Sequence, residues 1–219
     1  MCEVIVLFEG YSTQIDDVTM DANCSCTLIK SPHKNVIVDT MCAWDRQNII
    51  EALTKYNMQP ENINYIVCSH SHADHIGNNN LFLDADEHIV GTTVHKLTLF
   101  HERNIKNCDY KLCDGIKVMA TPGHTAEDVT VIVNGKFNGK EVIVAITGDL
   151  FEKEEDITDS SIWINLGVPE LRQVQALSRC KVANISNVII PGHGPPFFVT
   201  DNIRNQLAKQ LEEIKLKQS

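Results

Sequence analysis

The feature that most restricts the fold is a repeated pairing of a short apolar run with a histidine or an aspartate. The runs NYIVCS, IKVMATPG, EVIVAITG and NVIIPG are directly followed by His70, His124, Asp149 and His193. Glycine ends three of these runs, at positions 123, 148 and 192, where it permits a sharp turn and a close backbone approach. If the runs are β-strands that end at one sheet edge, the four polar side chains meet in one place.

A denser group of the same side chains lies at residues 70–75, where HSHADH adds His72, Asp74 and His75. Any single member of the set has an ordinary explanation, such as a turn histidine, a core histidine or an aspartate that caps a helix. The joint pattern instead predicts a metal centre. Its expected ligands are His70, His72, Asp74, His75, His124, Asp149 and His193.

The donor types narrow the choice of metal. Imidazoles and carboxylates without a thiolate suit Zn²⁺, or Fe or Mn, better than Mg²⁺ or Ca²⁺. Because these donors exceed what one tetrahedral ion accepts, we expect two Zn²⁺ per chain that share a carboxylate. Two ions about 3.5–4 Å apart can share a hydroxide nucleophile, which predicts hydrolysis. We expect Asp74 to orient this nucleophile, with Asp149 and His193 as further catalytic residues.

The rest of the chain predicts an α+β fold. Other β-branched runs are EVIVLF, CTLIK, NVIVD and DVTVIV, and helical periodicity appears at residues 45–57, 169–181 and 201–217. Near-continuous apolar strands are typical of sheets covered by helices. We therefore expect an αββα sandwich of two mixed sheets packed face to face. The absence of repeats and of linker-like stretches favours a single domain over residues 1–219.

Composition excludes several classes of protein. The net charge of −10 argues against a broad basic surface for nucleic acid, although a small site could draw positive charge from bound metal. No apolar run approaches the roughly 18 residues that span a bilayer, and the N-terminus does not resemble a signal peptide. We expect an intracellular protein with buried free thiols at Cys24, Cys26, Cys42 and Cys68. Cys108 and Cys113 have loose zinc-like spacing without a second pair.

The motifs HSHADH, TPGHT, TGDLF and PGHGPP resemble those of the metallo-β-lactamase superfamily, from the first strand to about residue 200. The resemblance implies that His70, His72 and His124 hold one metal. It implies that Asp74, His75 and His193 hold the other and that Asp149 bridges the two. Asp39, in VDT, matches an aspartate that supports the site by hydrogen bonding. Met41 follows Asp39-Thr40, where the superfamily usually has glycine, which alters the pocket rim.

Finer motifs, including VDT with Trp44, GDLFE, SSIW with Trp163 and PGHGPPF, resemble a small animal member of the glyoxalase II-like group. This resemblance implies a zinc endoribonuclease for the 3′ end of histone pre-mRNA, active as a homodimer in the cytosol and nucleus. A thioesterase of the hydroxyacylglutathione hydrolase type is the main alternative. A β-lactam hydrolase and a metal-stabilised binding protein without catalysis are the others. The 22 residues that follow PGHGPPF are enough for one helix but not for the helical C-terminal domain of glyoxalase II enzymes, which favours the nuclease over the thioesterase.

The remaining predictions concern the site's surroundings. Trp44 and Trp163 are the only tryptophans, and each could stack a base at the mouth of the site or lie in the core. Residues 151–170 are acidic and predict either a solvated loop or a lid. Replacement of Trp163 by alanine is expected to lower substrate affinity more than stability. His33, His88, His95 and His101 are expected to be surface or packing residues.

Overall fold

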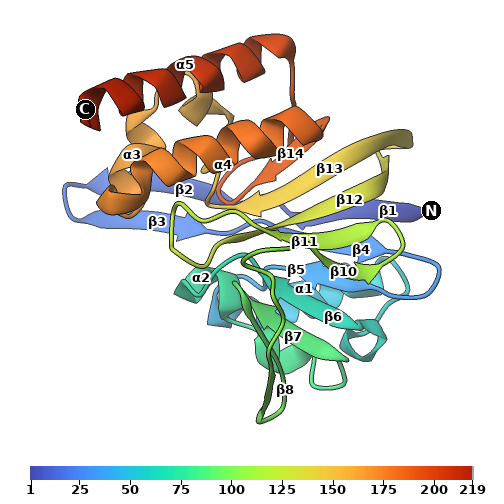
Figure 1. Ribbon diagram of the computed structural model, residues 1–219. Helices are drawn as coiled ribbons and strands as arrows, with labels where there is room; N and C mark the ends of the chain where they lie inside the picture. The colour runs from blue at the N-terminus through green and yellow to red at the C-terminus, as the bar shows by residue number, and fades with distance from the viewer. Residues whose placement is uncertain (219) are drawn as a thin grey trace.

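The computed structural model describes residues 1–218, with strands at the centre and helices on both outer sides (Figure 1). The strands are β1 Cys2–Phe8, β2 Tyr11–Asp16, β3 Thr19–Asn23, β4 Cys26–Lys30, β5 Val36–Val38, β6 Tyr65–Cys68, β7 Glu87–Val90, β8 Thr93–Lys96, β9 Leu99–His101, β10 Tyr110–Cys113, β11 Ile116–Ala120, β12 Val129–Phe137, β13 Lys140–Gly148, β14 Val188–Pro191 and β15 Phe197–Phe198. The α-helices are α1 Arg46–Thr54, α2 Ala73–Ile76, α3 Ser161–Leu166, α4 Arg172–Ile185 and α5 Asp201–Gln218. Short 3₁₀ helices are η1 Ala43–Asp45, η2 Pro60–Asn62, η3 Asn79–Leu81, η4 Glu154–Ile157 and η5 Pro169–Leu171.

Strand β1 joins two mixed sheets. Strands β15, β14, β13, β12 and β11 pair in that order on one side, and β4 to β9 pair in sequence order on the other. The first half of β12 pairs with β11, and its last residues pair in parallel with the start of β1. Strand β1 also pairs antiparallel with β4. Hydrogen bonds therefore run continuously from one sheet into the other.

The two faces of each central strand explain why the sheets pack together. Neighbouring residues in a strand point to opposite faces. In β4, Ile29 lies in the core between the sheets, whereas Leu28 packs in the cluster that contains residues of α1. In β14, Ile190 lies in the central core, whereas Ile189 packs with residues of α4 and α5. The predicted αββα sandwich is confirmed.

The helices cover the outer faces of the sheets, as Figure 1 shows for α4 and α5 above β13 and β14. The helix predicted at 45–57 corresponds to η1 and α1, which buries Ile49 and Leu53. The predicted C-terminal helix at 201–217 corresponds to α5. Ile203 and Leu207 of α5 pack in the same cluster as Val182 of α4, so α5 packs on its own chain.

The segment 151–170 differs from both sequence interpretations. It is neither a solvated loop nor a free lid, because it forms η4, α3 and η5 and buries Asp156 and Trp163. Asp156 forms a fully buried ion pair with Arg179 of α4. Its acidic neighbours Glu154 and Glu155 are exposed, and they give the segment the composition of a loop.

The structure bears on the predictions for the cysteines and for a membrane-spanning segment. All eight cysteines are free thiols, and Cys24, Cys26 and Cys68 are buried as predicted. The prediction is wrong for Cys42, which is only half-buried, because it lies in the turn just before η1 rather than in a strand. Over residues 1–218, neither Cys108 nor Cys113 belongs to a group of three side chains placed to hold a metal. No helix in that range has the length and apolar character needed to cross a bilayer.

Candidate metal centre

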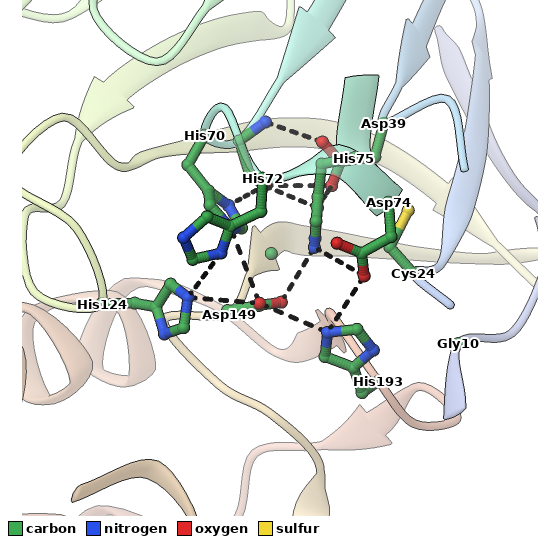
Figure 2. Close-up of polar contacts among 12 residues, drawn as sticks. Gly10, Cys24, Asp39, His70, His72, Asp74, His75, His124, Asp149 and His193 are labelled. Atoms are coloured by element: carbon green, nitrogen blue, oxygen red, sulfur yellow. Dashed lines mark hydrogen bonds and ion pairs between the residues drawn. The ribbon is translucent and has the colours of Figure 1, made fainter. Parts of the chain in front are cut away.

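The metal-ligand candidates stand where strands of both sheets end. Asp39 follows β5, His70 follows β6 by one further residue, and Asp149 directly follows β13. The parallel neighbour of β13 is β14, and His193 lies two residues beyond it. Parallel strands end at the same sheet edge, which brings side chains from distant parts of the sequence together. Figure 2 shows these side chains pointing toward one another.

The first donor group contains three imidazoles and one carboxylate oxygen (Figure 2). His72 Nδ1 lies 2.8 Å from His70 Nε2 and 3.1 Å from His124 Nε2. Asp149 Oδ2 lies 3.6 Å from His70 Nε2 and 3.5 Å from His124 Nε2. The sequence-predicted ligands of the first metal therefore converge through one nitrogen each.

The second donor group lies on the other side of Asp149. Asp74 Oδ2 is 3.7 Å from His75 Nε2 and 3.7 Å from His193 Nε2. Asp149 Oδ1 is 3.2 Å from His75 Nε2, and Asp149 Oδ2 is 3.3 Å from His193 Nε2. Asp149 therefore faces both groups, as a bridging carboxylate would.

The side chains fit a pair of metal ions. His75 Nε2 and Asp149 Oδ1 are buried and lack a hydrogen-bond partner among residues 1–218. His72 Nδ1 faces both His70 Nε2, at 2.8 Å, and His124 Nε2, at 3.1 Å. Because a neutral imidazole has one donor and one acceptor nitrogen, these three nitrogens cannot all form hydrogen bonds with one another. A cation between them satisfies several lone pairs at once, and imidazole with carboxylate is the donor set that zinc accepts.

Comparison with known proteins agrees with this geometry. The model of the metallo-β-lactamase superfamily matches residues 20–217. This chain belongs to the metallo-β-lactamase superfamily. Metallo-β-lactamase domain-containing protein 1 of Xenopus laevis is 37% identical over 210 residues, which cover 94% of this chain and 85% of the frog protein. The human protein of the same name is 34% identical over 176 residues, covering 75% of this chain and 59% of its own length.

More distant similarities appear both in sequence and in fold. N-acyl homoserine lactonase of Bacillus thuringiensis is 26% identical over 163 residues, which cover 68% of this chain and 63% of the lactonase. A metallo-β-lactamase of Pseudomonas aeruginosa, solved in its mono-zinc form, aligns with a TM-score of 0.61 at 15% identity, covering 95% of this chain and 97% of its own. An N-acyl homoserine lactone hydrolase with product at its catalytic metal centre aligns with a TM-score of 0.51 at 17% identity, covering 99% and 89%.

Burial and neighbouring carboxylates together determine the pKa values of the histidines in the two donor groups. It lowers the pKa of His70 to about 2 and that of His124 to about 4, so both imidazoles are neutral near pH 7. Burial opposes a charge on His193 as well, but the carboxylates of Asp149 and Glu152 raise its pKa to about 9. Burial would also raise the pKa of Asp149, but His75 and His193 outweigh it and hold this pKa well below its usual range. The Asp149 carboxylate is therefore ionised.

Asp39 has the supporting contacts that the superfamily resemblance implied. Its Oδ1 accepts the backbone N–H of Ser69 at 2.7 Å, and its Oδ2 accepts the Ser69 hydroxyl at 3.1 Å. Asp39 Oδ2 also lies 3.1 Å from His75 Nδ1, and Ser69 Oγ lies 3.0 Å from His70 Nδ1. These contacts hold one imidazole of each donor group by the ring nitrogen that faces away from the centre.

Met41 occupies the position where the superfamily usually has glycine. Its φ of 57° lies in the left-handed region that glycine adopts at no steric cost. Met41 is 5% exposed and packs in the cluster that contains Leu53 and Ile66, so core packing compensates for the strained backbone. The side chain of Met41 is therefore directed into the core, away from the rim that the sequence led us to expect it to alter.

Two of the predicted glycine turns depend on the missing side chain. A Cβ at Gly192 would overlap Asp149 Oδ1, and one at Gly148, whose φ is +50°, would overlap the Ser69 hydroxyl. Glycine therefore lets the backbones of β13 and β14 approach the ligands. The hairpin β2–β3 completes this side of the site, since the backbone oxygens of Tyr11 and Asn23 lie 3.2 and 3.1 Å from His193 Nδ1.

The two predicted substrate contacts have different environments. Trp44 in η1 is 89% exposed. Trp163 is fully buried in a cluster with Ala176 of α4 and Leu211 and Ile214 of α5, which favours the core alternative over contact with substrate. Its neighbours in sequence are polar or half-buried, and only the packing of α3 takes its ring out of solvent.

Sequence analysis missed two polar residues of the centre, Ser69 and Glu152. Ser69 directly precedes the HSHADH motif, and Glu152 closes the GDLFE motif. Glu152 is 1% exposed and lies in a group with Asp149 and His193 that is placed to hold a metal. Their position beside or within a motif was the only sequence signal for a role in the centre. Burial of a glutamate is rare, and the neighbouring residues do not predict it.

Proposed function

We propose that this protein is a two-metal hydrolase whose ions, zinc at both positions, are held by the two donor groups. The observation that carries the proposal is the placement of Asp149 between three imidazoles on one side and Asp74, His75 and His193 on the other. Structural zinc sites are closed and rich in cysteine. Here the donors are histidines and carboxylates, and His72 is exposed, so the centre opens to solvent.

The chain's own residues prepare the site for hydrolysis. Bound divalent ions supply a Lewis acid and a hydroxide nucleophile at neutral pH. Asp74 is the most accessible of the clustered carboxylates, with 22% of its side chain exposed. Its Oδ2 points at His75 and His193, which leaves Oδ1 to accept a hydrogen bond from the attacking water and to orient it. Asp149 and the buried histidines form the rigid base of the site.

The leading substrate class is the phosphodiester of single-stranded RNA, including histone pre-mRNA. Support comes from the resemblance of the finer motifs to the animal endoribonuclease and from 37% identity to the frog protein. Two metals also suit in-line displacement, since each can stabilise one oxygen of the reacting phosphate. The exposed Trp44 offers a surface on which a base can stack. We further propose that the protein acts as a homodimer in the cytosol and nucleus.

Hydrolysis of an acyl substrate, a thioester or a lactone, is the second candidate. It is favoured by the similarity to N-acyl homoserine lactonase and by exposed apolar side chains on the β2–β3 hairpin beside His193. Ile15 is 64% exposed and Val18 is 93% exposed, which suits an apolar acyl chain better than a nucleotide. The net charge of −10 also differs from the basic character that is typical of RNA-binding domains.

The deciding experiment is parallel hydrolysis of three labelled substrates by the zinc-loaded protein: a single-stranded RNA, a glutathione thioester and an acyl homoserine lactone. Variants His193→Ala and Asp149→Ala remove a ligand of one or both metals. Variant His33→Ala removes an exposed histidine outside both donor groups and serves as the matched control.

Each outcome assigns the function. RNA cleavage by the wild type and by His33→Ala, but by neither ligand variant, supports the ribonuclease. Equal RNA cleavage by all four proteins indicates a contaminating nuclease. A wild type that binds two metals and leaves RNA intact, but hydrolyses an acyl substrate, moves the function to the second candidate. A metal-loaded wild type inert toward all three substrates contradicts both.

A further inference from the structure

Glu152 is a buried carboxylate whose backbone is fixed on both sides. Its N–H donates to Asp156 Oδ2 at 2.9 Å, and its carbonyl oxygen accepts the His193 N–H at 2.8 Å. The residue is 1% exposed. Since a lone ionisable group is seldom buried without a partner, its side chain requires an explanation.

The imidazole of His124 is the candidate partner for the Glu152 carboxylate. Glu152 Oε1 and His124 Nδ1 are both buried, both lack a hydrogen-bond partner among residues 1–218, and lie 3.5 Å apart. A well-formed N–H···O hydrogen bond between these atoms measures about 2.7–3.2 Å. A shift of less than about 1 Å in either side chain would therefore satisfy both groups at once.

The other buried imidazoles show what His124 lacks without Glu152. The Nδ1 of His70 lies 3.0 Å from the Ser69 hydroxyl, and that of His75 lies 3.1 Å from Asp39. The Nδ1 of His193 lies 3.1 Å from a backbone oxygen. Each of these rings therefore has an acceptor on its outer nitrogen, which leaves Nε2 for the centre. Glu152 supplies the same acceptor for His124.

We propose that Glu152 is a positioning residue whose carboxylate accepts the Nδ1–H of His124 and thereby presents His124 Nε2 to the first metal. The inference rests on the proposed metal centre. A carboxylate on the outer nitrogen of a ligating imidazole fixes its tautomer and increases its basicity, and loss of such a partner lowers metal affinity about 10–100-fold.

A competing explanation is that Glu152 binds metal directly, because its carboxylate lies in a group with Asp149 and His193. Two variants separate the explanations. Glu152→Leu keeps the side-chain volume and removes the acceptor. Glu152→Gln keeps an oxygen that can accept the Nδ1–H of His124, but its neutral amide is a poor zinc ligand. Glu154→Leu, at an exposed neighbouring carboxylate, is the matched control.

The experiment measures zinc stoichiometry and stepwise affinity by competition with a chromophoric chelator. Histidine tautomers in the zinc-loaded proteins are read by long-range ¹H–¹⁵N NMR. We expect Glu152→Leu to lose about 10–100-fold in affinity for one zinc and to lose the Nδ1-proton signal of His124. Glu152→Gln should keep that signal and most of the affinity. Glu154→Leu should match the wild type.

Three results overturn the inference. Glu152→Leu that retains both the wild-type affinities and the His124 signal shows that Glu152 does not position the ring. Equal losses in the Leu and Gln variants indicate direct ligation. If Glu152→Leu and Glu152→Gln lower the melting temperature of the zinc-free protein equally and leave zinc affinity unchanged, the role of Glu152 is purely structural. A wild type that binds no zinc overturns the metal centre together with the inference, whereas the first three results leave the centre intact.

Discussion

The two tryptophans give a sharp test of the structure, because one is fully buried and the other is 89% exposed. Trp163 lies under α4 and α5, and the Arg179 guanidinium lies 5.0 Å from its ring centroid. We predict that Trp163→Ala lowers the free energy of unfolding much more than substrate affinity. This reverses the expectation from the sequence, where Trp163 was a candidate for substrate contact.

The magnitude follows from burial. A buried aromatic side chain removes about 150–250 Å² from water, worth about 4–6 kcal/mol at about 25 cal/mol per Å². The buried indole Nε1 of Trp163 has no hydrogen-bond partner among residues 1–218, which offsets about 1–3 kcal/mol. Measured replacements of buried Trp by Ala cost about 3–5 kcal/mol. We expect a loss of about 4 kcal/mol, which lowers Tm by about 8–16 °C for a chain of this size.

The assay is urea unfolding followed by far-UV circular dichroism on zinc-loaded protein, with Trp44→Ala as the matched control. Trp44→Ala should change the free energy of unfolding by less than about 0.5 kcal/mol. Tryptophan fluorescence of each variant gives an independent check. Trp44→Ala leaves only the buried ring and should emit at shorter wavelength than Trp163→Ala. A loss below about 1 kcal/mol for Trp163→Ala, or equal losses in the two variants, would refute this account of α3.

Three further predictions concern buried polar groups and the glycine turn. Asp156→Ala leaves Arg179 buried without its ion-pair partner and should cost about 3–5 kcal/mol in urea unfolding, whereas replacing the exposed Asp159 should not. Burial raises the pKa of Asp128 to about 7, so its protonated form stabilises the fold below the unfolded pKa, and that stability is lost as pH rises through 7. In the metal-free protein, the stability of Asp128→Asn relative to wild type should therefore rise by up to about 4 kcal/mol between pH 4 and 8, and pH-independent differences in calorimetry would contradict this. Gly192→Ala places a methyl group against the Asp149 carboxylate and should reduce bound zinc below the wild-type ratio in elemental analysis, and an unchanged ratio would contradict the bridging role.

Much of the site was predictable because its chemistry is written in local motifs. HSHADH places several donors within six consecutive residues. A glycine before His124, Asp149 and His193 marks where a strand ends and the backbone turns. The layers were predictable for a related reason. Strands such as VIV at Val36–Val38 are apolar on successive residues, which requires cover on both faces.

The residues that local patterns misplaced depend on long-range contacts. Asp45 is the type of residue that caps a helix N-terminus, and it occupies the N-cap position of α1. Its carboxylate, however, accepts side-chain hydrogen bonds from Asn23 and Asn48 rather than a backbone N–H. Asp156 stands in a run of acidic residues whose composition is that of a solvated loop, yet Arg179, distant in sequence, draws it into the core. Pairing across such separations has no local signature.

The family, the types of candidate metal ligand and the αββα layers could be predicted from the amino-acid sequence, because donor spacing and apolar periodicity are properties of neighbouring residues. Which polar side chains share the centre follows only from the packing of the folded chain. That packing places Asp149 between both donor groups, buries Trp163 and brings Glu152 next to His124. The physical reason is that burial and pairing depend on how the two sheets and α4 pack, and this packing joins residues that the chain separates.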